Sequence, residues 1–192
     1  MKFLTVVRHA KSSWDQPNLQ DHDRPLNARG CAAAPAVARF LSMTYFGAGT
    51  EVPLMVPPDS LVSSTAVRTL ATSEHLAKHF SLSKDQIRLD SRLYLAPPPT
   101  ILEAVRGFDE TSRHAVLVGH KPGLHDFCNR LLSRASIPKM PTCTAVIMSL
   151  PHAYWGLTDW QEAQLIAYIT PKALERRFPT EYKGISSTEM ED

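Results

Sequence analysis

Short apolar segments rich in β-branched residues alternate with amphipathic segments four times along this 192-residue chain. The short segments read as buried strands, whereas apolar residues three and four positions apart predict helices between them. The expected strands are residues 3–7, 61–62, 87–89 and 115–118, and a helix is expected after each of them. A crossover helix lets the next strand run in the same direction. The pattern therefore predicts an α/β fold of three layers, with a mostly parallel sheet and helices on both faces.

Capping residues mark where these helices are expected to begin. Asn27 can cap the first helix, and Ser64 or Thr65 can cap the second, because their side-chain oxygens accept hydrogen bonds from the first turn. Residues 97–99 are prolines that precede the third helix, and Pro122 is expected to open the fourth. These start signals agree with the hydrophobic pattern.

The remaining segments add strands at one side of the sheet and a tail. Residues 145–150 and 165–169 read as two further strands that follow each other closely and are expected to lie together. Residues 47–58, which contain several Gly and Pro, are expected to form a connection. The polar segment 183–192 is expected to be a disordered tail, so a single domain is predicted over residues 1–182.

Charge, hydropathy and cysteine usage exclude several classes of protein. The net charge is only +2 and no block of Lys and Arg stands out, so a nucleic-acid partner is not expected. No apolar run approaches the length of about 18 residues that a membrane helix needs, so no membrane partner is expected. Cys31, Cys128 and Cys143 form no CxxC pair, which argues against a disulfide framework or a zinc site. A cytoplasmic location is the expectation that remains.

Two arginines and two histidines stand where the expected strands end. The first strand ends in Arg8 and His9. The second leads into Arg68 in the first turn of its helix, and the fourth ends just before His120. Parallel strands meet at one edge, where α/β proteins bind ligands. Arginines hold phosphoryl oxygens and a neutral imidazole is a competent nucleophile, so the four together predict a phosphoryl-transfer site.

Four stretches of sequence surround these residues in order. They are Arg8-His9-Ala10-Lys11-Ser12-Ser13-Trp14, Asp23-Arg24-Pro25-Leu26-Asn27-Ala28-Arg29-Gly30, Ser63-Ser64-Thr65-Ala66-Val67-Arg68-Thr69 and Val118-Gly119-His120-Lys121-Pro122-Gly123-Leu124. The first resembles the RHG signature of the histidine phosphatase superfamily, with alanine in place of the glycine, a change that adds only a methyl group and should be tolerated. The others resemble its small SixA-like branch, the phosphohistidine phosphatases. The match runs from Phe3 to about Thr170 and implies a phosphoglycerate-mutase-like fold.

The resemblance also implies a role for each of the four residues. His9 would be the nucleophile that becomes phosphohistidine, and Arg8 and Arg68 would bind the phosphoryl oxygens. His120 would stabilise the group in transfer, and water would then hydrolyse the intermediate without a metal or another cofactor. For Arg24 two roles stay open, because it could reach the pocket or hold its own loop.

One departure from the superfamily concerns its proton donor. Mutases and ester phosphatases carry an acidic residue that should fall near residues 93–96, where this chain reads Leu-Tyr-Leu-Ala. The acidic residues nearby in sequence read more simply as solvated or turn residues; they are Glu74, Asp90, Glu103, Asp109 and Glu110. The absent acid is consistent with the SixA-like branch and predicts a preference for phosphohistidine over phosphate esters.

Two other patterns imitate phosphatase motifs. Cys128 and Arg134 have the spacing of cysteine-dependent phosphatases, but the residues between them include no glycine and continue a helical stripe. The segment 21–23 (Asp-His-Asp) resembles the DxD of aspartyl phosphotransferases, but no apolar strand precedes it, so it is expected to be a loop.

Further clusters are expected to be structural. His75 and His79 have helical spacing but no zinc motif around them, which indicates a solvated or half-buried pair rather than a metal site. Three aromatic residues between the last two strands are expected to form a hydrophobic plug or a turn rather than a surface on which a nucleobase stacks; they are Tyr154, Trp155 and Trp160.

The residues together predict a metal-independent phosphatase with His9 as its nucleophile, acting on phosphohistidine of a protein. A small-molecule phosphomonoesterase or mutase with the same pocket is the alternative within enzymes, so the partner is either a phosphorylated protein or a small phosphorylated substrate. A non-catalytic phosphate-binding module is the alternative from another class. It is less favoured because binding alone would not require a nucleophile.

Overall fold

A computed structural model describes residues 1–47 and 54–186 of the chain. It contains six strands, which are β1 (Lys2–Arg8), β2 (Ser60–Ser63), β3 (Ile87–Leu89), β4 (His114–Gly119), β5 (Ala145–Leu150) and β6 (Gln164–Ile169). They form one sheet in the order β3-β2-β4-β1-β5-β6. The first four strands are parallel, whereas β5 lies antiparallel to β1 and β6 antiparallel to β5. The predicted α/β fold with a mostly parallel sheet is confirmed, and the last two strands lie together at one side as expected.

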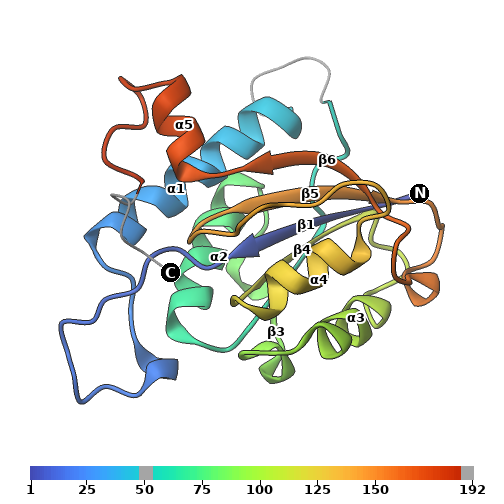
Figure 1. The fold of residues 1–192 in the computed structure, drawn as a ribbon, viewed down its shortest axis with the longest axis horizontal. Helices are drawn as coiled ribbons and strands as arrows, with labels where there is room; N and C mark the ends of the chain where they lie inside the picture. The colour runs from blue at the N-terminus through green and yellow to red at the C-terminus, as the bar shows by residue number, and fades with distance from the viewer. Residues whose placement is uncertain (48–53, 187–192) are drawn as a thin grey trace.

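Helices cover both faces of this sheet (Figure 1). The α-helices are α1 (Ala28–Tyr45), α2 (Val67–His79), α3 (Pro98–Arg106), α4 (Gly123–Leu131) and α5 (Pro171–Arg177). Residues of α1, α2 and α5 pack in one apolar cluster, and residues of α3 and α4 pack in a second cluster on the other face. Short 3₁₀ helices lie between these elements; they are η1 (Asp21–Asp23), η2 (Lys84–Gln86), η3 (Ser91–Leu93) and η4 (Trp155–Leu157).

The two-residue period of the strands divides the core into these two clusters. In β4, Ala115 and Leu117 pack toward α3 and α4, whereas Val116 and Val118 pack toward α1 and α2. Successive side chains of a strand point to opposite faces, so a strand covered on both faces is apolar throughout. The continuous apolar runs that identified these strands in the sequence therefore reflect burial on two sides.

Two helix starts differ from the predictions. The N-cap of α2 is Ala66, not Ser64 or Thr65, because the hydroxyl of Ser64 hydrogen-bonds His120 and that of Thr65 hydrogen-bonds His22. Helix α5 was not predicted, although its start signals are present. Thr170 accepts a hydrogen bond from the Ala173 amide, and a proline occupies the first helical position.

The end of the described chain lies against α5. Ile185 is buried, and Ser186 donates from its amide and its hydroxyl to Glu175. Residues 187–192 of the expected tail, and residues 48–53 of the expected connection, lie outside the described residues. Within residues 1–47 and 54–186, no helix has the length and apolar character needed to cross a membrane.

Candidate active site

The register of the sheet places His9 beside His120. Arg8 pairs with Gly119 across β1 and β4, and the His9 amide donates to the Gly119 carbonyl oxygen at 3.1 Å. The two imidazole rings therefore lie with their centroids 5.2 Å apart. Arg68, in the first turn of α2, donates to both rings at 3.4 Å, from Nε to His9 Nε2 and from Nη2 to His120 Nδ1. The ends of two strands and the start of one helix thus bring these three side chains together.

His9 is held in a single tautomer. Its Nδ1 lies 2.7 Å from the carbonyl oxygen of Ala10, which can only accept a hydrogen bond, so Nδ1 carries the proton and Nε2 keeps its lone pair. Burial lowers the pKa of His9 well below 6.5; the Ala10 hydrogen bond opposes this effect, and the charges of Arg68 and Arg8 add to it. The ring is therefore neutral at pH 7, with an unprotonated Nε2 whose lone pair accepts the long contact from Arg68 and can serve as a nucleophile once an anion takes that contact over.

His120 is also neutral and is anchored by Ser64. Because its Nδ1 accepts from Arg68, its Nε2 carries the proton and donates to Ser64 Oγ at 2.9 Å. Burial, followed by the charge of Arg68, lowers the pKa of His120 to about 3. The Ser64 hydroxyl can also donate, so the pair can adopt the other tautomer, in which Nδ1 donates to a bound anion.

Two guanidinium groups supply the positive charge at this edge of the sheet. Arg68 is almost completely buried, and its contacts with the two histidines are long for hydrogen bonds. An anion between the rings can replace these long contacts with shorter, charge-assisted ones. Arg8 donates from Nη1 to the Met140 carbonyl oxygen at 2.8 Å, and its charge lowers the pKa of both histidines. The set can bind a phosphoryl group in front of His9 Nε2.

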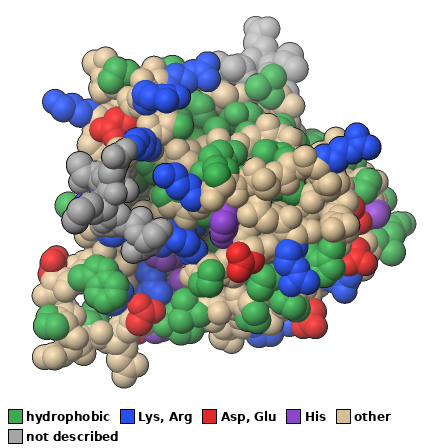
Figure 2. Space-filling view, viewed as in Figure 1, with side chains coloured by type: hydrophobic (Ala, Val, Ile, Leu, Met, Phe, Trp, Pro, Cys, Tyr) green, Lys and Arg blue, Asp and Glu red, His purple; other side chains and the backbone are tan. Residues whose placement is uncertain are grey.

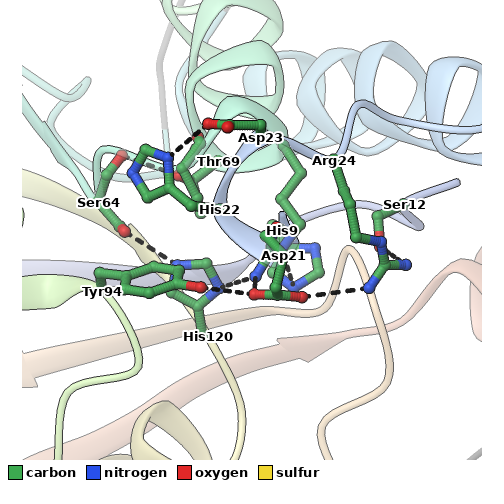
Figure 3. A network of polar contacts seen from close by, with 12 residues as sticks. His9, Ser12, Asp21, His22, Asp23, Arg24, Ser64, Thr69, Tyr94 and His120 are labelled. Carbon is green, nitrogen blue, oxygen red and sulfur yellow. Dashed lines mark hydrogen bonds and ion pairs between the residues drawn. The ribbon is translucent and has the colours of Figure 1, made fainter. Parts of the chain in front are cut away.

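Asp21 lies at this site, a role that the sequence analysis did not predict when it expected segment 21–23 to be a loop. Its carboxylate accepts hydrogen bonds from Arg68 Nη2 at 2.8 Å and from the Tyr94 hydroxyl at 2.6 Å (Figure 3). Its carbonyl oxygen accepts a further bond from Arg68 Nη1. Sequence gave only a weak signal for this role, because η1 is a single 3₁₀ turn within an otherwise irregular segment.

Neither member of the Asp21–Tyr94 pair is a strong proton donor at neutral pH. Burial alone would raise the pKa of Asp21, but the hydrogen bonds from Tyr94 and Arg68 outweigh it and lower the pKa to about 2. Burial and the adjacent carboxylate raise the pKa of the Tyr94 phenol above its usual value of 10. Tyr94 stands in the segment where relatives were expected to carry an acid, and its ring edge also packs against His120, with centroids 5.3 Å apart.

Arg24 holds the loop between β1 and α1. Its guanidinium donates to the Ser13 carbonyl oxygen at 2.8 Å and to Ser12 Oγ at 3.0 Å, and it stacks on the Trp14 ring. A third bond, of 3.1 Å, reaches Asp21 Oδ1 (Figure 3). The sequence left open whether Arg24 reaches the pocket or holds its own loop. The structure shows that Arg24 holds its loop and contacts the site through Asp21.

The fold resembles that of several solved phosphatases. The protein histidine phosphatase SixA, complexed with tungstate, gives a TM-score of 0.71 at 16% sequence identity over 90% of this chain and 99% of that one. A protein of Agrobacterium tumefaciens assigned as a SixA phosphohistidine phosphatase gives 0.68 at 23% identity over 88% and 98% of the two chains. The mycobacterial glucosyl-3-phosphoglycerate phosphatase Rv2419c gives 0.57 at 18% identity over 86% and 97%. These likenesses show that the chain has the fold of these phosphatases.

Relatives found by sequence cover most of the chain. No model of a protein family matches the chain. An uncharacterized chloroplastic protein of Arabidopsis thaliana, At3g52155, is 30% identical over 175 residues, which cover 83% of this chain and 69% of the relative, so the two belong to one family. An uncharacterized protein of Mycobacterium leprae, ML1117, is 25% identical over 86% of this chain and its own whole length.

The patterns set aside in the sequence lie outside the candidate active site, apart from Asp21. Cys128 is fully buried in α4, and burial strongly raises the pKa of its thiol, so it is not a reactive thiolate. Trp155 is a buried plug whose indole donates to the Ser112 carbonyl oxygen at 3.0 Å. Among residues 1–47 and 54–186, no three His, Cys, Asp or Glu side chains are grouped as metal ligands.

Proposed function

We propose that this chain is a metal-independent phosphatase that uses His9 as a nucleophile and hydrolyses phosphohistidine on proteins. One observation carries the proposal. The neutral His9 ring donates from Nδ1 to Ala10, and its Nε2 lone pair faces the donors of Arg68 beside a second neutral histidine. An imidazole held in this way is prepared for attack on phosphorus and needs no base to activate it.

The first step transfers the phosphoryl group to His9. The substrate phosphoryl enters between the two rings, where Arg68 and Arg8 bind its oxygens and offset its charge. Nε2 donates its electron pair to phosphorus, and the bond to the leaving group breaks in line with this attack. The phosphorylated ring keeps its proton on Nδ1, and the Ala10 carbonyl continues to accept it.

The second step releases phosphate and restores the site. A water molecule attacks phosphorus from the side that the leaving group has vacated, and the bond to Nε2 breaks. His9 recovers its lone pair, one proton of the attacking water passes to a phosphoryl oxygen, and inorganic phosphate departs as the dihydrogen anion. Donors that are already aimed at the phosphoryl oxygens lower the barrier of both steps.

The chemistry of the leaving group determines which class of substrate we propose. Expulsion of an alkoxide needs a proton donor, which contributes about 10²- to 10⁴-fold in rate. The carboxyl group at this site belongs to Asp21, and its pKa of about 2 keeps it ionised. The imidazole of a phosphohistidine can leave as a neutral ring, so it loses little without a donor. We therefore propose N–P bonds in preference to O–P bonds.

The comparisons support the proposal in part and leave an alternative. SixA is a protein histidine phosphatase with bound tungstate, a tetrahedral oxyanion like phosphate. Rv2419c acts on glucosyl-3-phosphoglycerate, which makes a small-molecule phosphomonoesterase the second candidate.

We further propose that residues 1–182 form the catalytic domain. The three free cysteines fit a reducing compartment such as the cytoplasm.

The test compares two classes of substrate and traps the intermediate. We expect kcat/KM on a phosphohistidine peptide to exceed that on phosphoglycerates and sugar phosphates at the same pH and salt. Label from the substrate should appear on His9 when the reaction is quenched in alkali, because acid destroys phosphohistidine. His9→Asn should abolish labelling and turnover, whereas His75→Asn, on the half-exposed side of α2, should retain both.

Three results would count against the proposal. Higher kcat/KM on alkyl phosphomonoesters would favour the alternative substrate class. Label on Cys128 or on a serine would assign the nucleophile elsewhere. Anion binding without turnover of any phosphorylated substrate would indicate a phosphate-binding module.

A further inference from the structure

A strongly basic groove opens beside the candidate active site. It has a volume of about 520 Å³ and is lined by seven Lys and Arg side chains. These are Arg8, Lys11, Arg29, Lys121, Lys139, Lys172 and Arg176. No Asp or Glu is among the described residues that line this groove. One third of the 21 Lys and Arg residues of the chain therefore faces one groove, although the net charge is only +2.

The groove is continuous with the site. Arg8 lines the groove and also lowers the pKa of His9 and His120 by its charge. Lys121 directly follows His120 in the chain and lines the groove as well. From there the lining extends over residues of α1 and α5, and Figure 2 shows Lys and Arg side chains gathered on this side of the molecule. A ligand whose phosphoryl group lies at His9 can therefore reach the groove with its adjoining part.

We propose that this groove binds an acidic segment next to the phosphohistidine of the substrate protein. The inference rests on the proposed function and adds a sequence preference to it. Lys139, Lys172 and Arg176 are exposed at the rim, where they can meet carboxylates of another chain. Complementary charge of this kind steers encounter and selects partners.

The lining favours a peptide over a nucleotide. Tyr168 is the one aromatic residue among the described lining residues, and its hydroxyl donates to the Lys139 carbonyl oxygen at 2.7 Å. A nucleobase would need aromatic faces on which to stack, whereas an extended acidic segment needs spaced cations and some apolar surface. Pro138, Met140 and Pro141 supply that surface along the groove.

The test measures selectivity between two phosphohistidine peptides that differ only at their flanking residues. One carries Asp and Glu on both sides of the phosphohistidine, and the other carries Asn and Gln. We expect the full chain to show about tenfold higher kcat/KM on the acidic peptide at low salt, with the ratio falling as salt is raised. The combined variant R29Q, K139Q and R176Q should bring the ratio close to one.

A matched variant controls for the loss of charge in general. K78Q, R113Q and R134Q together remove three exposed cations that do not line this groove, so the ratio should stay near that of the unmodified chain. Residues 187–192 include three acidic residues, which could compete with an acidic peptide for the groove. A parallel set of proteins therefore carries E189Q, E191Q and D192N. A ratio that falls equally in the groove and control variants would overturn the proposal.

A binding measurement separates this proposal from the proposed function. The affinity of the unphosphorylated acidic peptide, measured by fluorescence anisotropy, requires no turnover and should weaken in the groove variant alone. Equal turnover of both peptides without binding of the acidic one would overturn the groove proposal and leave the phosphatase intact. Binding of inorganic triphosphate but not of the acidic peptide would overturn the choice of a protein segment. Binding of the acidic peptide with turnover of neither phosphohistidine peptide would instead contradict the proposed function.

Discussion

Replacement of Ser64 by alanine tests how far the site depends on the orientation of His120. Ser64 Oγ lies 2.9 Å from His120 Nε2, and both residues are buried. In Ser64→Ala the ring nitrogen loses this hydrogen bond in a place that water does not readily reach. A buried polar group left without its partner costs about 1 to 3 kcal/mol.

The cost can appear as lost activity or as lost stability. If the His120 ring keeps its position, the unpaired ring nitrogen destabilises the folded protein, and the free energy of unfolding decreases by about 1 to 3 kcal/mol. If the ring turns to find another partner, it no longer presents Nδ1 to the phosphoryl group, and kcat/KM falls by about 5- to 150-fold, the same energy expressed as a rate. We expect at least a tenfold fall in kcat/KM on a phosphohistidine peptide, because a turned ring also loses its contact with Arg68.

Ser73→Ala is the matched control. Ser73 is also a fully buried serine, but its hydroxyl has no hydrogen-bond partner among the described residues. Its replacement should leave kcat/KM unchanged and the free energy of unfolding equal or slightly higher. Both variants are measured by steady-state kinetics and urea unfolding. A Ser64→Ala protein with unchanged kcat/KM and unchanged stability would refute the role assigned to this hydrogen bond.

Three further predictions follow from the geometry. The pKa of His9 lies well below 6.5 and that of His120 near 3, so both rings stay neutral as the pH falls through 6.5. After correction for substrate ionisation, kcat/KM should therefore show no loss centred at pH 6.5, and a loss with its midpoint at that pH would contradict the assignment of neutral rings. Gly30→Ala would place Cβ 2.1 Å from the Lys11 carbonyl oxygen and should destabilise the fold by about 2 kcal/mol or more. In the control Gly107→Ala, the new Cβ has no neighbouring atom closer than 3.6 Å, so equal stability of the two variants in urea unfolding would refute the steric argument. Activity should survive dialysis against a chelator, because guanidinium groups supply the charge; loss of activity that a divalent ion restores would disprove this.

The sequence was sufficient for features that depend on local patterns. Continuous apolar runs identified the inner strands β1, β2, β4 and β5, because a strand buried on both faces is apolar throughout. The direction of the parallel strands followed from the helices between them, and this direction placed Arg8-His9 and His120 at the same edge. The motifs around these residues showed the resemblance to the histidine phosphatase superfamily for the same reason, since each motif is a short stretch with its own spacing.

The tertiary structure decided everything that depends on the path of a loop or on the partner of a side chain. Asp21 binds Arg68 and Tyr94, which lie 47 and 73 residues away in the chain, and no local pattern encodes such a pairing. Ser64 looked like a helix cap, but its hydroxyl is used by His120 instead. The basic groove is assembled from residues between Arg8 and Arg176, which are too scattered to form a charged block in the sequence. Spacing along the chain reports which face of an element a residue occupies, whereas only the packed fold determines which distant group it meets.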